Sequence, residues 1–124
     1  MIECLVNGEI SNFVETTNRG LNYGDGIFET LSVHSGRPRR WQAHMDRLGA
    51  GCERLGMTMP PQAVLLREVQ TVSAGLADAV VKIVLTREGQ GRGYMPVMDG
   101  NCVRIVSAHF YPDNIEELAR DGVE

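Results

Sequence analysis

Short alternating stretches of hydrophobic and polar residues dominate the first forty positions of the chain. Residues 3–10 predict a β-hairpin, because Asn7-Gly8 suits the tight turn between two short strands. Residues 27–34 alternate as a half-buried strand does. Ser35-Gly36 predicts a turn after that strand, and residues 37–41 are predicted to return beside it.

From residue 43 the hydrophobic period changes to that of a helix. A first helix is predicted over residues 43–55, with Gly56 placed where a helix C-cap would be. Pro60-Pro61 then opens a second helix over residues 61–75. The apolar residues of the two stripes are Leu48, Cys52 and Leu55 in the first helix and Leu65, Val69, Val72 and Leu76 in the second.

Two further strands are predicted in the second half of the chain. Residues 79–86 are rich in β-branched side chains, which favours a central strand, and residues 101–110 predict another. The glycine-rich residues 88–93 between them predict a loop, and residues 115–120 predict a short helix.

Strands grouped around a helical pair predict an α+β fold. We expect a small two-layer domain, with a mainly antiparallel sheet and two helices packed on one side of it. Residues 27–34, 79–87 and 102–110 should share that sheet.

The composition excludes several classes of protein. The chain has 124 residues and a hydrophobic content of 43%, which is enough for one modest core. A net charge of -4 gives no reason to expect binding to nucleic acid or to an anionic membrane. No apolar run approaches the roughly 20 residues needed to span a bilayer, and no secretory signal is visible. Three scattered cysteines fit neither a disulfide framework nor a metal site. We therefore expect a cytoplasmic protein without a bound metal.

Three segments carry candidate chemistry. Residues 18–30 bring three glycines to the entry of a strand, which indicates a specially shaped backbone, although an ordinary turn would also explain them. His44 and Arg47 lie three residues apart, on one helix face away from the apolar stripe, where an arginine can bind a phosphate; a solvated arginine is the alternative. Residues 86–94 place two arginines and a tyrosine in a glycine-rich loop, which suits binding of an anionic ligand; a mobile basic loop is the alternative.

The order of these segments resembles the class IV aminotransferase family, also called fold type IV among pyridoxal-phosphate enzymes. The resemblance rests on Arg19-Gly20, on residues 23–30 (YGDGIFET), on residues 44–48 (HMDRL) and on residues 86–94 (TREGQGRGY). It extends from about Val6 to the end of the chain. Asn18, in place of the usual aspartate, and Glu88, in place of a usual glycine, depart from the family pattern.

The resemblance implies the cofactor pyridoxal 5'-phosphate, with Arg47 in the position that binds its phosphate. Residues 1–124 correspond to the small N-terminal domain. The lysine that binds the cofactor covalently is expected beyond Glu124, in a larger domain that this chain lacks, so no catalytic residue is expected here. Lys82, the single lysine, lies inside a predicted strand and is not expected to replace it. The family implies a homodimer.

Within the family the chain is most similar to the aminodeoxychorismate lyases. That subgroup implies conversion of 4-amino-4-deoxychorismate to 4-aminobenzoate and pyruvate in folate biosynthesis, with Phe28, Arg92 and Tyr94 near an anionic substrate. A D-amino-acid or branched-chain aminotransferase is the enzymatic alternative. A non-catalytic binding or dimerisation domain is the alternative from another class.

Overall fold

A computed structural model describes residues 1–87 and 102–111 of the chain. The predicted loop at 88–93 and the predicted helix at 115–120 lie outside the described residues. The elements in chain order are β1 (Glu3–Val6), β2 (Glu9–Ile10), α1 (Arg19–Tyr23), β3 (Gly26–His34), β4 (Arg37–Pro38), α2 (Trp41–Leu55), α3 (Gln62–Val72), β5 (Asp78–Arg87) and β6 (Cys102–His109).

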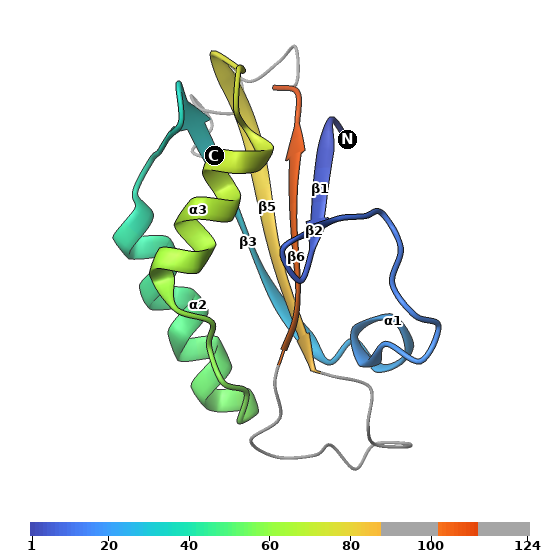
Figure 1. Cartoon of the computed structure of the whole chain (residues 1–124). Coiled ribbons are helices and arrows are strands. Elements are labelled where there is room, and N and C mark those ends of the chain that lie inside the picture. The colour runs from blue at the N-terminus through green and yellow to red at the C-terminus, as the bar shows by residue number, and fades with distance from the viewer. Residues whose placement is uncertain (88–101, 112–124) are drawn as a thin grey trace.

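The strands form a six-stranded sheet in the order β2-β1-β6-β5-β3-β4, and neighbouring strands pair antiparallel. The long strands β3, β5 and β6 lie side by side, with β5 between the other two (Figure 1). The prediction that these three segments share one sheet, with residues 79–86 central, is confirmed.

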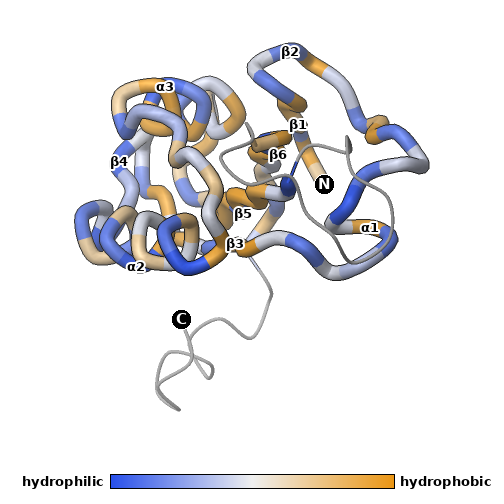
Figure 2. Tube along the Cα trace, turned by 90° about the horizontal axis from the view of Figure 1, so that it is seen from below, coloured by the Kyte–Doolittle hydropathy of each residue, from blue (hydrophilic) through white to orange (hydrophobic). Residues whose placement is uncertain are grey.

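Helices α2 and α3 cover one face of the sheet, while the short helix α1 lies on the other side (Figure 1). Hydrophobic residues gather between the helices and the strands (Figure 2). The core residues contributed by the helices include Met45, Leu48, Cys52, Leu65, Val69 and Val72, and those of the sheet include Leu31, Val33, Val81, Ile83, Leu85, Val106 and Ala108. The predicted α+β two-layer architecture is confirmed, and so are both helical stripes except at their ends, where Leu55 and Leu76 are only partly buried and Leu76 follows α3.

Both predicted hairpin turns are present. Asn7 and Gly8 have φ angles of 52° and 85°, and Ser35 and Gly36 have 48° and 79°, as the primed turns of two-residue hairpins require. The returning strand, however, is shorter than predicted, because only Arg37 and Pro38 pair with β3. Proline has no N–H to extend the ladder, and Trp41, placed in that strand by prediction, instead begins α2.

The helices differ from prediction mainly at their ends. Helix α2 begins two residues earlier than predicted and ends at Gly56 with a φ of 68°, the expected left-handed C-cap. Helix α3 ends at Val72, before the predicted limit at Gly75, whose φ is 78°. Helix α1 was not predicted, because its five residues carry no apolar periodicity.

Candidate functional site

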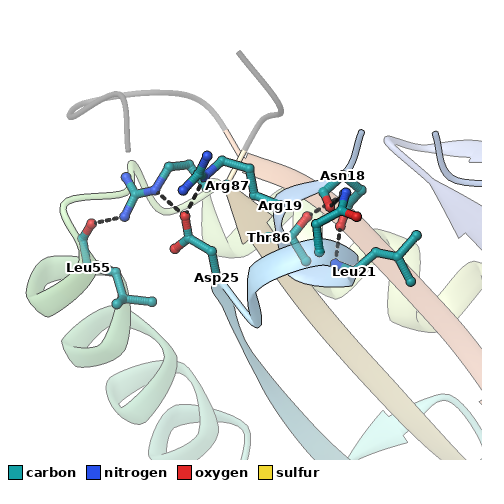
Figure 3. Close-up of polar contacts among 8 residues, drawn as sticks. Asn18, Arg19, Leu21, Asp25, Leu55, Thr86 and Arg87 are labelled. Carbon is teal, nitrogen blue, oxygen red and sulfur yellow. Dashed lines mark hydrogen bonds and ion pairs between the residues drawn. The ribbon is translucent and has the colours of Figure 1, made fainter. Parts of the chain in front are cut away.

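The glycine-rich segment before β3 is anchored by a buried cluster of two arginines and one carboxylate (Figure 3). Asp25 Oδ2 accepts hydrogen bonds from Arg19 Nε at 2.9 Å and from Arg87 Nε at 2.8 Å. The side chains of Arg19 and Arg87 are only 2% and 3% exposed, and that of Asp25 is 12% exposed. Arg87 also donates to the carbonyl of Leu55, so the cluster joins α1, β3, β5 and the end of α2.

The charge of Asp25 is stabilised by this arrangement. Burial alone would raise the pKa of its carboxyl, but hydrogen bonds and charge attraction from Arg19 and Arg87 outweigh burial and lower the pKa. Asp25 therefore stays ionised, and its negative charge compensates the positive charge of the buried Arg19 and Arg87 side chains.

Asn18 extends the same anchor on the other side of α1 (Figure 3). Its amide Nδ2 donates to Thr86 Oγ1 at 2.8 Å, and its Oδ1 accepts from the backbone N–H of Leu21 at 3.0 Å. Asn18 is thus the N-cap of α1 and ties that helix to the end of β5. Asparagine, which departs from the family pattern at this position, uses both halves of its amide here.

Two glycines of the segment are required by close packing. A Cβ on Gly20 would lie 2.3 Å from Thr86 Cγ2, and a Cβ on Gly26 would lie 2.7 Å from the carbonyl oxygen of Leu85. The alternative of an ordinary turn is therefore wrong. The residues that carry this motif pack α1 and the entry of β3 against β5.

Arg47 lies beside the start of β3, held by a neighbouring carboxylate. Glu29 Oε1 accepts hydrogen bonds from Arg47 Nη2 at 2.8 Å and Nε at 3.2 Å, and lies 2.6 Å from His44 Nδ1. The Arg47 side chain is 64% exposed, whereas that of Glu29 is 14% exposed. The motifs gave Glu29 no role. Its carboxylate nevertheless holds the exposed guanidinium of Arg47 in one orientation.

The pair has the ionisation states expected for an ion pair. Burial would raise the pKa of Glu29, but hydrogen bonds and attraction from Arg47 and His44 lower it below its usual range. The hydrogen bond to Glu29 and its charge raise the pKa of Arg47.

The predicted helix face of His44 and Arg47 is correct in one respect and wrong in another. The two side chains do meet, with Arg47 Nη2 3.1 Å from His44 Nδ1. His44, however, is 8% exposed and lies on the buried side of α2, because residues four apart adjoin on a helix and Leu48 is its neighbour. Arg47 therefore flanks the apolar stripe instead of lying away from it.

A hollow of about 610 Å³ opens between α2 and the first half of β3. Its lining residues are Gly26, Ile27, Phe28 and Glu29 of β3 and Arg47, Leu48, Ala50, Gly51 and Arg54 of α2. Two arginines and one carboxylate give the lining a net positive charge, and the guanidinium hydrogens of Arg47 that Glu29 does not engage remain as donors. The hollow could hold an anionic group such as a phosphate.

Phe28 and Lys82 lie together on the sheet face that α2 and α3 leave uncovered. Phe28 is 61% exposed, and Lys82 Nζ lies 4.8 Å from the centroid of its ring. The register pairs Lys82 with Thr30 of β3 and with Ser107 of β6. The alternation of β3 and β5 could have indicated this grouping, but the motifs alone gave Lys82 no role. Arg92 and Tyr94, the other predicted substrate residues, lie outside the described residues.

No group of three or more His, Cys, Asp or Glu side chains in residues 1–87 and 102–111 is arranged to hold a metal ion. Over the same residues, no helix has the length and apolar character that crossing a membrane requires. The three cysteines, Cys4, Cys52 and Cys102, are free thiols.

Comparison with known proteins identifies related chains. Residues 26–121 match the family described as amino-transferase class IV. The aminodeoxychorismate lyase of Vibrio harveyi is 32% identical over 119 residues, which make up 96% of this chain and 44% of that protein. A D-alanine aminotransferase of Listeria monocytogenes is 30% identical over 56 residues, 45% of this chain and 19% of that protein.

A solved structure shows the same fold. The crystal structure of 4-amino-4-deoxychorismate lyase from Pseudomonas aeruginosa superimposes with a TM-score of 0.78 and 38% sequence identity, covering 90% of this chain and 42% of that one. The chain thus spans less than half the length of these lyases.

Proposed function

We propose that this chain, which belongs to the class IV aminotransferase family, works as the N-terminal domain of an aminodeoxychorismate lyase. The observation that carries the proposal is the extent of its similarity to lyases, which covers 96% of the chain in one relative and 90% in a solved structure. The reaction would convert 4-amino-4-deoxychorismate to 4-aminobenzoate and pyruvate.

The hollow between α2 and β3 supports a site for the phosphate of pyridoxal 5'-phosphate. A phosphate dianion needs strong, oriented donors, and Arg47 offers a planar fork that Glu29 holds in place. The positive lining of the hollow favours the same ligand. In this proposal Arg47 binds the phosphate, and Glu29 and His44 position Arg47.

Pyridoxal phosphate, when bound, supplies an electron sink for a reaction at the carbon that bears the substrate amine. The covalent lysine would come from a further domain, since the lyase relatives are more than twice as long as this chain. We further propose that the full-length enzyme is a homodimer and that it works in the cytoplasm.

The uncovered sheet face supports an anionic substrate. The ammonium of Lys82 is exposed there beside the ring of Phe28, and no carboxylate pairs with it among the described residues. A substrate carboxylate would meet a cation and an apolar ring surface side by side. Arg92 and Tyr94 of the following segment are proposed to complete the substrate site.

A D-amino-acid aminotransferase is the second candidate, because one D-alanine aminotransferase matches 45% of the chain. That match is less than half as long as the match to the lyase. A complementation test in a strain that requires 4-aminobenzoate for growth distinguishes the two functions. The full-length gene should restore its growth if the protein is a lyase and should fail to do so if it is an aminotransferase.

A further inference from the structure

Polar side chains form a row across the middle of the uncovered sheet face. The antiparallel register places Thr30 of β3, Lys82 of β5 and Ser107 of β6 directly beside one another. Partners in such a register point to the same face of a sheet. The row therefore combines one ammonium and two hydroxyl groups.

His109 joins this row from the next position of β6 on the same face. Ser107 Oγ and His109 Nε2 are 2.9 Å apart, which fixes the imidazole ring relative to the hydroxyl. His109 is half-buried, and its register partner on β5 is Val80. Lys82 and His109 are thus diagonal neighbours, whose positions in antiparallel strands lie about 7–8 Å apart.

The imidazole and the ammonium influence each other. Burial lowers the pKa of His109, and repulsion from the α-amino group of Met1 and from Lys82 lowers it further. These are the charged groups that act on His109 from β5 and from the chain preceding β1; its contact on β6 is the neutral Ser107. The lowered pKa favours the neutral form of His109, and a nearby anion would favour its protonation.

We propose that Lys82, Ser107 and His109 form a two-point subsite for a small molecule with two carboxylate groups. Lys82 binds one carboxylate, and His109, positioned by Ser107, donates a hydrogen bond to the second. This inference rests on the proposed function, because it assigns the two acidic groups of the lyase substrate class to the open sheet face.

The surroundings favour a flat dicarboxylate. The neighbouring row of the same face is apolar and consists of Phe28, Val84 and Ile105, which the register places side by side. Lys82 lies in the next row and His109 in the row beyond it, so a ring beside these apolar side chains would direct its carboxylates toward the polar rows. A ligand with a single carboxylate would engage Lys82 and leave His109 uncharged.

The test is the pKa of His109, measured by NMR from its imidazole signals with isophthalate, with benzoate and without ligand. Binding of the dicarboxylate should raise this pKa by about one unit, which corresponds to about tenfold tighter binding to the protonated form. Benzoate should leave it nearly unchanged. His109→Gln identifies the signals, and His34→Gln, on the same face beside Asp78, is the matched control.

Two variants separate the proposed contacts from a general effect on the fold. Lys82→Met should raise the pKa of His109 without ligand, since it removes a repelling charge, and should abolish the shift with isophthalate. Ser107→Ala should keep isophthalate binding and reduce the shift, because the imidazole is no longer fixed. Lys82 is exposed, so Lys82→Met should fold normally.

An equal shift with benzoate and isophthalate, or an isophthalate shift that survives in Lys82→Met, would overturn the subsite. Lyase activity of the full-length protein, measured as release of pyruvate from 4-amino-4-deoxychorismate, is tested independently of this result. Lyase activity with an unmoved His109 pKa refutes the subsite alone, whereas a dicarboxylate-specific shift without lyase activity supports the subsite and refutes the proposed function.

Discussion

Asp25 and Arg87, separated by 62 positions in the chain, are joined by a hydrogen bond of 2.8 Å between Arg87 Nε and Asp25 Oδ2. Arg19 shares the same carboxylate oxygen at 2.9 Å. The contact brings the end of β5 to the entry of β3, the strand that carries Phe28 and Glu29. The geometry of the candidate site therefore depends on a carboxylate that lies outside the hollow between α2 and β3.

Asp25→Asn should lower the free energy of unfolding by about 3–5 kcal/mol, because it removes the carboxylate charge that two buried guanidinium groups share. Urea denaturation of the chain measures this loss. Asp46→Asn, an identical change at an exposed position of α2, is the control and should alter stability by less than about 0.5 kcal/mol. Equal effects of the two substitutions would show that the cluster contributes no particular stability.

The same carboxylate predicts how stability depends on pH. Its folded pKa is lowered from the usual 3.8, so its contribution is complete above that value and is lost as pH falls through the lower folded pKa. The difference in unfolding free energy between the natural chain and Asp25→Asn should thus shrink on acidification below pH 3.8. A difference that stays constant down to the point of acid unfolding would contradict the lowered pKa.

Gly20→Ala should destabilise the chain by about 1–3 kcal/mol, although alanine favours a helix, because its Cβ would overlap Thr86 Cγ2. Serine at position 86 lacks that methyl group, so Thr86→Ser should remove much of the penalty in the double variant. A double-mutant cycle of unfolding free energies measures this coupling. The control is Gly49→Ala on α2, where the nearest atom is the flexible Met59 Sδ at 3.3 Å. Additive effects of Gly20→Ala and Thr86→Ser would contradict the overlap.

Much of the fold could be predicted from hydrophobic period alone. The stripes of α2 and α3 and the β-branched stretch of β5 identify their elements, because burial of one face imposes a regular pattern on each. Turn chemistry also sufficed at Asn7-Gly8 and Ser35-Gly36. Helix α1 escaped prediction because its five residues carry no apolar periodicity, and its N-cap Asn18 is held against Thr86 by a long-range contact that the sequence does not indicate.

The candidate site was predictable only in part. Arg47 follows from its helix position and from the family motif, but Glu29 and Lys82 do not. Glu29 reaches Arg47 across the space between β3 and α2, and Lys82 reaches Phe28 from the neighbouring strand, so both contacts depend on packing and register. The arginines at 19 and 87 belong to motifs, yet their shared carboxylate appears only when the strands are paired.

Arg47→Ala in the full-length protein should weaken binding of pyridoxal phosphate at least about tenfold, since hydrogen bonds to a charged group contribute about 1.5–3 kcal/mol each. Arg47→Lys should restore part of the affinity, because a point charge cannot reproduce the guanidinium fork. Titration of the protein with the cofactor, followed by its absorbance, measures both. Arg67→Ala on the exposed side of α3 is the control. Unchanged affinity in Arg47→Ala would remove the phosphate site from the hollow.

Glu29→Gln tests the positioning of that arginine. The substitution keeps the shape of the side chain but removes the charge that holds Arg47 Nε and Nη2. We expect cofactor affinity to fall by about threefold to tenfold, less than in Arg47→Ala, in line with loss of one charged hydrogen-bonded contact. If Glu29→Gln binds the cofactor more tightly instead, Glu29 competes with the phosphate for Arg47 and does not position it.

The most direct test of the lyase proposal is a product assay on the full-length protein with pyridoxal phosphate and 4-amino-4-deoxychorismate, with no amino acceptor present. We expect 4-aminobenzoate and pyruvate to appear in equal amounts, and residues 1–124 alone to release neither, because the covalent lysine is assigned to a further domain. Transfer of the amino group from D-alanine to a 2-oxo acid, with no pyruvate released from 4-amino-4-deoxychorismate, would contradict it.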